Sequence, residues 1–118
     1  MPGYTDNAKN GMLGQLRGRI THISLHTASP GSAGTNEVSG GSYARASVSA
    51  SNFTAASGGE FTLNAPLNFN GPASGAATHI GIWDASNFLG GGAITGDTAF
   101  NAEGAFILQA GTAFDLNG

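Results

Sequence analysis

The fold is decided by the stretch ATHIGIWD, residues 77–84, which carries the clearest strand pattern in the chain. Successive side chains of a strand point to opposite faces, so Ile80 and Ile82 share one face and Trp83 lies on the other. Because both faces carry groups that a sheet tends to cover, the pattern predicts a central strand. Ile80 and Ile82 then belong to the core, and Trp83 lies under a loop or at a subunit contact.

Further short strands are expected on both sides of this segment. Runs of alternating or β-prone residues separated by Gly, Pro, Asn and Ser are typical of strands and turns. The expected strands cover residues 19–27, 43–50, 61–63, 67–69, 88–96, 105–110 and 113–116, with a further strand residue at Phe53. The first of them is expected to be half buried. Seven or eight such strands predict an all-β fold, a single β-sandwich or jelly-roll-like domain.

The N-terminal part precedes this β pattern, and we divide the chain into an arm or short helix over 1–18 and a β domain over 19–118. Within the arm, residues 6–17 fit a helix with Asp6 or Asn7 as the N-cap. Its apolar face has three members: Met12, Leu13 and Leu16. Glycines inside the segment limit the expected helix to one or two turns. We expect the arm to dock onto a partner and to become ordered on binding.

The loop at residues 28–42 is long and rich in turn-forming residues, with Glu37 as its one charge. Long ordered loops in small domains are usually contact surfaces. We therefore expect this loop to be ordered by contact with a neighbouring subunit.

Composition limits the classes of partner. Charged residues are 9% of the 118 residues and the formal net charge is -3, which is no footprint for nucleic acid or an anionic membrane. There are no cysteines for disulfides or thiolate metal sites. No apolar run approaches membrane-spanning length, and the N-terminus lacks the pattern of a secretion signal, so a soluble protein is expected. So few charges also leave little repulsion between copies in an assembly.

One internal similarity is visible. The segment THISL at 21–25, followed by Ala28, recurs as THIGI at 78–82, followed by Ala85. Two interpretations are open: a duplicated half-domain, or coincidence between two short β segments of similar composition. Two copies are too few for a solenoid.

The histidines are the first candidates for a metal site, because zinc is often held by imidazoles. His22 and His26 lie on one expected strand, roughly 13 Å apart, which is too far for two ligands of one ion. Pairing of either with His79 across two strands would still need a third ligand that no motif supplies. We therefore expect no metal site.

Catalytic patterns are also missing from the sequence. The SGGS at 39–42 has loop composition rather than that of a nucleophile elbow, and the GGG at 90–92 lacks the spacing of a phosphate-binding loop. The triple glycine is expected to mark close backbone packing or a bulge. The carboxylates are scattered singly: Asp6, Glu37, Glu60, Asp84, Asp97, Glu103 and Asp115. We therefore expect no catalytic residues, no cofactor and no enzyme activity.

Aromatic residues lie about one to a strand or turn: Phe53, Phe61, Phe69, Trp83, Phe88, Phe100, Phe106 and Phe114. This spread favours a role in the core. The alternative is a platform that stacks sugars, which would need several rings on one exposed face.

Four blocks carry a resemblance to known proteins: LHTASPG at 25–31, NEVSGGSYAR at 36–45, THIGIWDA at 78–85 and FLGGGAITG at 88–96. In this order they resemble small structural proteins of tailed bacteriophages, which are labelled head decoration, tail fibre or minor tail proteins. The resemblance runs from about residue 20 to the C-terminus and leaves the N-terminal 18 residues outside.

The resemblance implies a virion protein that is made in the host cytoplasm. Our first expectation is a capsid decoration (cement) protein that binds the major capsid protein or other virion proteins and stabilises the assembled head by mass action. A symmetric homo-oligomer is expected, a trimer among the candidate states. The alternative is a tail fibre or minor tail component that contacts the host, and a third class is a small glycan-acting enzyme with two carboxylates in a cleft.

Overall fold

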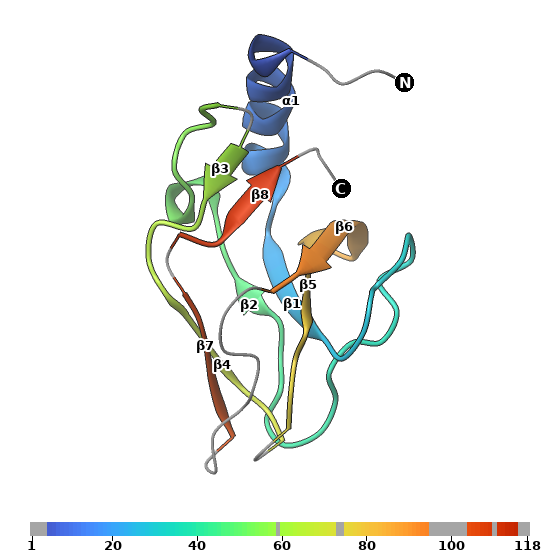
Figure 1. The fold of residues 1–118 in the computed structure, drawn as a ribbon. Helices are drawn as coiled ribbons and strands as arrows, with labels where there is room; N and C mark the ends of the chain where they lie inside the picture. Colours follow the sequence, from blue (N-terminus) through green and yellow to red (C-terminus); the bar gives the residue numbers. More distant parts are fainter. Residues whose placement is uncertain (1–4, 59, 73–74, 95–103, 110, 116–118) are drawn as a thin grey trace.

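One α-helix and eight strands form the described part of the chain, which in this computed structural model comprises residues 5–58, 60–72, 75–94, 104–109 and 111–115 (Figure 1). The elements follow in the order α1 (Asp6–Arg19), β1 (His22–His26), β2 (Ala46–Ser47), the 3₁₀ turn η1 (Ala50–Asn52), β3 (Glu60–Thr62), β4 (Leu67–Asn70), β5 (His79–Asp84), β6 (Asn87–Ala93), β7 (Ala105–Leu108) and β8 (Ala113–Asp115). The expected all-β class is confirmed. The strand expected over 43–50 is shorter, because only Ala46 and Ser47 pair with β1.

The strands form one four-stranded antiparallel sheet, in the order β2-β1-β5-β6, and two separate two-stranded ribbons, β3-β8 and β4-β7. In Figure 1 the β4-β7 ribbon runs along the left side of the molecule, and the β3-β8 ribbon lies close to α1. The segment over 77–84 is confirmed as a central strand, since β5 pairs with β1 on one side and with β6 on the other.

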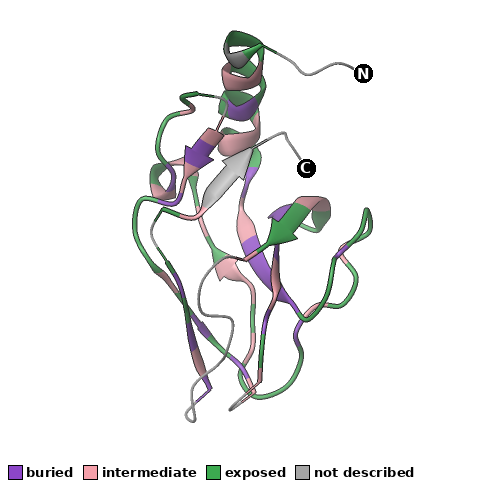
Figure 2. Ribbon diagram, viewed as in Figure 1, coloured by how far each residue is buried: buried purple, intermediate pink, exposed green. Residues whose placement is uncertain are grey.

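One face of the four-stranded sheet supplies the core. Ile23 lies opposite Ile82 and Leu25 opposite Ile80 in the β1-β5 register, so four large aliphatic side chains point the same way. All four are buried, as expected for Ile80 and Ile82 (Figure 2). The expectation that β1 would be half buried is wrong, because Ser24 and His26 on its other face are also fully buried.

Aromatic side chains from the ribbons complete the core. Phe61 of β3 packs edge-on against Phe53, with ring centroids 5.3 Å apart, and Phe69 of β4 against Phe106 of β7 at 6.4 Å. These four rings are at most 3% exposed, so the expectation that the aromatic residues form core is confirmed for them and for Trp83. Phe88 is half buried. Phe100 and the side chain of Phe114 lie outside the described residues.

The helix is longer than the sequence predicted. It spans 14 residues instead of one or two turns, and its N-cap is Thr5, whose hydroxyl accepts from the backbone N–H of Ala8, rather than Asp6 or Asn7. Tertiary contacts outweigh the cost of the glycines in this segment.

These contacts join α1 to the β structure. Leu13 is fully buried in the core, and the Arg17 guanidinium donates two hydrogen bonds to the carbonyl of Phe53, at 2.8 and 3.2 Å. The helix also ends at Arg19, one residue beyond the boundary drawn at residue 18. The division into 1–18 and 19–118 and the docking role of the arm stay predictions.

The two similar segments, 21–25 and 78–82, lie side by side as the paired strands β1 and β5. Ser24 is opposite Gly81 at the centre of the pairing. A half-turn about an axis through this pair exchanges the two strands and carries each residue of one segment onto its counterpart in the other.

The same half-turn relates the outer strands. The backbone N–H of Val48, after β2, donates to the carbonyl of Thr21, and the N–H of Ile94, after β6, donates to the carbonyl of Thr78, both at 2.9 Å. The sheet is therefore two hairpin-like pairs, β1-β2 and β5-β6, about a local twofold axis. This repetition favours a duplicated unit over coincidence.

Candidate functional site

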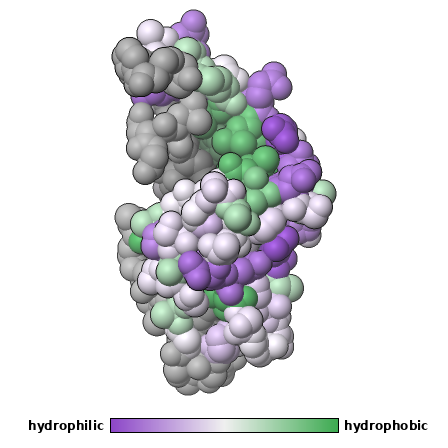
Figure 3. Space-filling model, turned by 90° about the vertical axis from the view of Figure 1, so that its right-hand side faces the viewer, coloured by the Kyte–Doolittle hydropathy of each residue, from purple (hydrophilic) through white to green (hydrophobic). Residues whose placement is uncertain are grey.

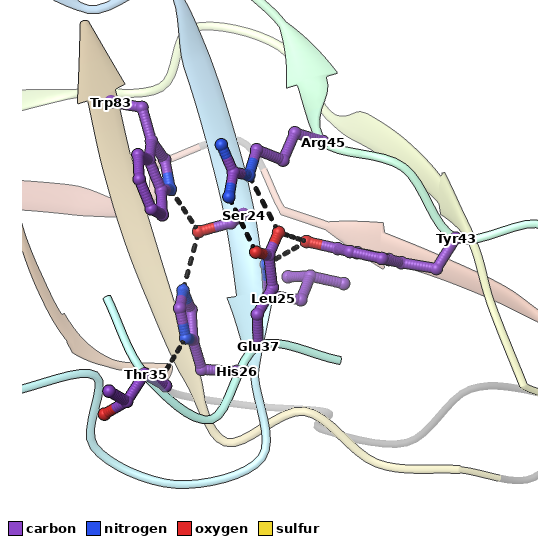
Figure 4. Close-up of polar contacts among 8 residues, drawn as sticks. All are labelled: Ser24, Leu25, His26, Thr35, Glu37, Tyr43, Arg45 and Trp83. Carbon is purple, nitrogen blue, oxygen red and sulfur yellow. Dashed lines mark hydrogen bonds and ion pairs between the residues drawn. The ribbon is translucent and has the colours of Figure 1, made fainter. Parts of the chain in front are cut away.

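A chain of buried polar groups lies on the second face of the sheet (Figure 4). The indole Nε1–H of Trp83 donates to Ser24 Oγ at 2.8 Å, Ser24 Oγ lies 2.6 Å from His26 Nε2, and His26 Nδ1 lies 2.7 Å from the carbonyl of Thr35. A carbonyl only accepts, so His26 carries its proton on Nδ1, and Nε2 is left to accept from the hydroxyl of Ser24. Every donor in this chain thus has one acceptor when His26 is neutral.

Gly81 makes room for this chain of groups. A Cβ atom at this position would lie 2.6 Å from Ser24 Oγ, 2.7 Å from His26 Nε2 and 2.9 Å from the ring of Phe88. Real Cβ atoms do not approach so closely, so the central strand needs glycine where its neighbour has serine. One hydroxyl fills the space that the two strands share at the local twofold axis.

A second cluster, from the segment that follows β1, covers the first. Arg45 donates from Nε and Nη2 to the two carboxylate oxygens of Glu37, both at 2.9 Å, and its guanidinium stacks 3.6 Å from the centroid of a Trp83 ring. The hydroxyl of Tyr43 donates to Glu37 at 2.8 Å and accepts from the backbone N–H of Leu25 at 3.0 Å. Glu37 is thus held from two sides and is tied through Tyr43 to β1.

These contacts shift the ionisation of the cluster. Burial alone would raise the pKa of the Glu37 carboxyl, but the hydrogen bonds from Arg45 and Tyr43 outweigh it and leave that pKa below its usual value. Burial, together with the carboxylate of Glu37, raises the pKa of Tyr43 well above its usual value, although the hydrogen bond from Leu25 acts in the opposite direction. The ionised glutamate and the neutral tyrosine are therefore the forms that the fold stabilises.

The loop at 28–42 is held against the sheet by contacts within the chain. Pro30 is buried and its carbonyl accepts from the backbone N–H groups of Gly34 and Thr35, both at 3.0 Å. Gly34, with φ +76°, sits so close to Trp83 that a Cβ there would lie 2.8 Å from the indole. Of the two places expected for Trp83, the structure gives the first: it lies under a loop. Contact of this loop with a neighbouring subunit stays a prediction.

The Ser24 hydroxyl, the His26 ring and the carbonyl of Thr35 follow one another as a nucleophile, a base and a group that orients the base do in a catalytic triad. Both side chains are fully buried, however, and the serine oxygen already accepts from Trp83. A hydroxyl enclosed in this way cannot meet a substrate, so the pair serves the fold. Sequence analysis missed the pairing, although the two residues stand at i and i+2 on one face of a strand.

The other expected site residues are separated. His26 lies opposite His79 across β1 and β5, while His22 lies at the other end of the pairing, opposite Trp83. Within the described residues no group of three or more His, Cys, Asp or Glu side chains gathers where it could hold a metal ion.

Two of the carboxylates are engaged in ion pairs: Glu37 with Arg45, and the more exposed Asp84 with Arg19 at 3.3 Å. Glu60 lies in the β3-β8 ribbon. Asp97, Glu103 and the side chains of Asp6 and Asp115 lie outside the described residues.

Within the triple glycine at 90–92, Gly91 shows the expected close packing, whereas a Cβ at Gly90 or Gly92 would have no atom within 4 Å. A Cβ at Gly91 would lie only 2.7 Å from the ring of Pro30 and closer still to the carbonyl of Ile80. The β5-β6 register also shifts between Ile82 and Trp83, next to this run. The run therefore marks both a close backbone approach and an irregularity in the ladder.

Comparison with known proteins gives a family. The model for the family described as podophage GP4 fiber I protein gp80 matches residues 18–113. The chain belongs to this family. It is therefore a structural protein of the phage virion, and the resemblance to virion proteins is confirmed. No curated protein matches the chain. No helix among the described residues is long and apolar enough to cross a membrane.

In this member of the family the four blocks that carried the resemblance meet at one place. LHTASPG supplies His26 and Pro30, NEVSGGSYAR supplies Glu37 and Arg45, and THIGIWDA supplies Trp83. The fourth block supplies residues 88–93 of β6, and Phe88 there packs against the tryptophan with ring centroids 5.1 Å apart. The blocks are thus the parts of one covered sheet face.

Proposed function

We propose that this chain is a non-enzymatic component of a podophage fibre, whose β domain binds other proteins of the virion. The observation that carries the proposal is the match of the fiber I family model to residues 18–113. The match includes β1 to β7, the first residue of β8 and only the last two residues of α1, so the proposal concerns the β domain described above.

The covered sheet face supports a binding role rather than a catalytic one. Its reactive groups are used within the fold, since the Ser24 hydroxyl and the His26 ring are fully buried and saturated with hydrogen bonds. The Arg45–Glu37 pair and the Trp83 ring clamp the following loop onto the sheet. A loop ordered in advance loses less entropy when it contacts a partner.

The surface also offers apolar area. On the face shown in Figure 3, hydrophobic residues gather in the upper half, bordered by hydrophilic ones. Met12 and Ile107 are large apolar side chains that stay 38% and 49% exposed. Contiguous apolar surface with a polar border is typical of protein contact sites.

Copy number and position in the particle test this proposal. Virions are purified, and this chain is quantified against the major capsid protein by mass spectrometry while gold-labelled antibodies locate it. A fibre component is expected in a handful of copies, with gold on fibres. Hundreds of copies, with gold over the capsid surface, would support the decoration role expected first from the sequence and would overturn the fibre assignment.

A further inference from the structure

The two edges of the four-stranded sheet differ, although the local twofold axis relates the strands that form them. β2 at one edge has two residues and lies against β4. β6 at the other edge has seven residues and pairs with β5 on its inner side. Among the described residues no strand pairs with the outer side of β6 (Figure 1).

Apart from the register shift near its start, β6 lacks the features that protect an exposed edge. Native proteins blunt such edges with charged side chains, proline or very short strands. The strand sequence, NFLGGGA over Asn87–Ala93, has neither a charge nor a proline. Its last three residues are exposed, and a Cβ built on Gly92 would have no atom within 4 Å.

The hydrogen-bonding direction along this edge follows from one backbone hydrogen bond at its end. The N–H of Ile94 donates to the carbonyl of Thr78, so it faces β5. In an antiparallel pair the polar backbone groups of successive residues face opposite sides. Those of Ala93 and Gly91 therefore face outward, as a row of donors and acceptors open to another strand.

We propose that two copies of this chain pair here, β6 against β6 and antiparallel, so that the two four-stranded sheets join across a twofold axis. A strand that pairs with its own copy about such an axis brings each outward donor opposite an acceptor of the same row. The strand carries no charge that would repel its copy, and the glycines leave no side chains to collide. A second copy thus supplies hydrogen-bond partners for the outward-facing backbone groups of β6.

The mass of the full chain in solution tests the pairing, measured by light scattering after size exclusion. We expect a dimer. Gly92→Lys places a charge on the pairing strand at a position where the new Cβ has no atom within 4 Å, so a monomer with an unchanged circular dichroism spectrum is expected. Ala55→Lys adds the same charge at an exposed position outside β6 and outside the loop at 28–42, and it should leave the dimer intact. A native chain that is a monomer or a trimer, or a Gly92→Lys chain that stays a dimer, overturns the proposal.

Amide hydrogen exchange on the unmodified chain gives a second test that needs no variant. The outward N–H of Ala93 should exchange slowly in the dimer, and its exchange should become faster as dilution yields the monomer. Fast exchange of this amide in a dimer would place the contact elsewhere and overturn the proposal. Protection that appears only after another virion protein is added would show that the occupant is that protein and not a second copy.

Discussion

Gly81→Ala is the substitution that probes the covered sheet face most sharply. The added methyl would lie 2.6 Å from Ser24 Oγ and 2.7 Å from His26 Nε2, so it must displace one of the two groups. Forcing a methyl into a close-packed site costs about 1–3 kcal/mol. A buried hydrogen bond broken with its partners left unsatisfied costs about 1–3 kcal/mol more. The smaller entropy of the unfolded alanine chain offsets about 0.4–1 kcal/mol of this, so we expect a net loss between about 1 and about 5.6 kcal/mol, with about 3 kcal/mol as the central value.

Urea unfolding measures this loss. The chain has one tryptophan, Trp83, which bonds to Ser24 and therefore reports on the same site. The matched control is Gly92→Ala, a glycine-to-alanine change in the neighbouring strand with no atom within 4 Å of the new Cβ. Its effect should stay within about 1 kcal/mol. Equal effects of the two substitutions would refute the reasoning.

The local twofold axis provides a sharper version of the same test. Exchanging the central pair, Ser24→Gly with Gly81→Ser, moves the hydroxyl from one strand to the other. The rotation that exchanges the strands also exchanges the positions of His26 and Trp83, so the moved hydroxyl still lies between them. The double variant should therefore be more stable than Gly81→Ser alone, and a double variant less stable than that single change would contradict the symmetry argument.

Three further predictions concern the core and the Arg45 cluster. Ile82→Ala should cost roughly 2–5 kcal/mol of unfolding free energy, because it leaves a cavity in the core, and chemical denaturation measures it; a loss below that of an exposed alanine substitution would move Ile82 out of the core. The pKa of Glu37 is lower in the folded state than in the unfolded state. Its carboxylate therefore stabilises the fold at pH values above the unfolded-state pKa, and this stabilisation is lost as the pH falls through the folded-state pKa. Melting temperatures of Glu37→Gln should therefore fall less towards acid pH than those of the native chain, and parallel curves would contradict this. Arg45→Lys loses the two-pronged contact and the stacking on Trp83, so we expect a loss of about 1 kcal/mol in urea unfolding, whereas an unchanged midpoint would show that the stack contributes nothing.

The elements that follow strand periodicity could be predicted from the sequence. The alternation around Ile80 and Ile82 gave the central strand and its core face, because period-2 patterns depend on local geometry alone. The same alternation placed Trp83 on the face opposite Ile80 and Ile82, and the pairing of β1 with β5 puts His26 on that face as well. The alternation could not show that the segment over 28–45 folds back over His26 and Trp83. That arrangement depends on tertiary contacts such as the one between Arg45 and Glu37, which are eight residues apart in sequence.

The helix could not be predicted at its full length for a similar reason. Its glycines lower local propensity, whereas its stability comes from the burial of Leu13 and the bonds of Arg17 to Phe53, residues far away in sequence. The Ser24–His26 pair shows a different limit. The spacing of the two side chains was visible, but their complete burial, which decides between chemistry and structure, was not.

A reconstruction of the intact podophage particle by electron cryomicroscopy tests the central claim most directly. The domain is recognisable in density by a four-stranded sheet with the order β2-β1-β5-β6 and by one helix that contacts the β3-β8 ribbon. The account predicts that this domain lies in a fibre, in contact with other virion proteins. A domain found instead at every site of the capsid lattice would contradict the fibre assignment.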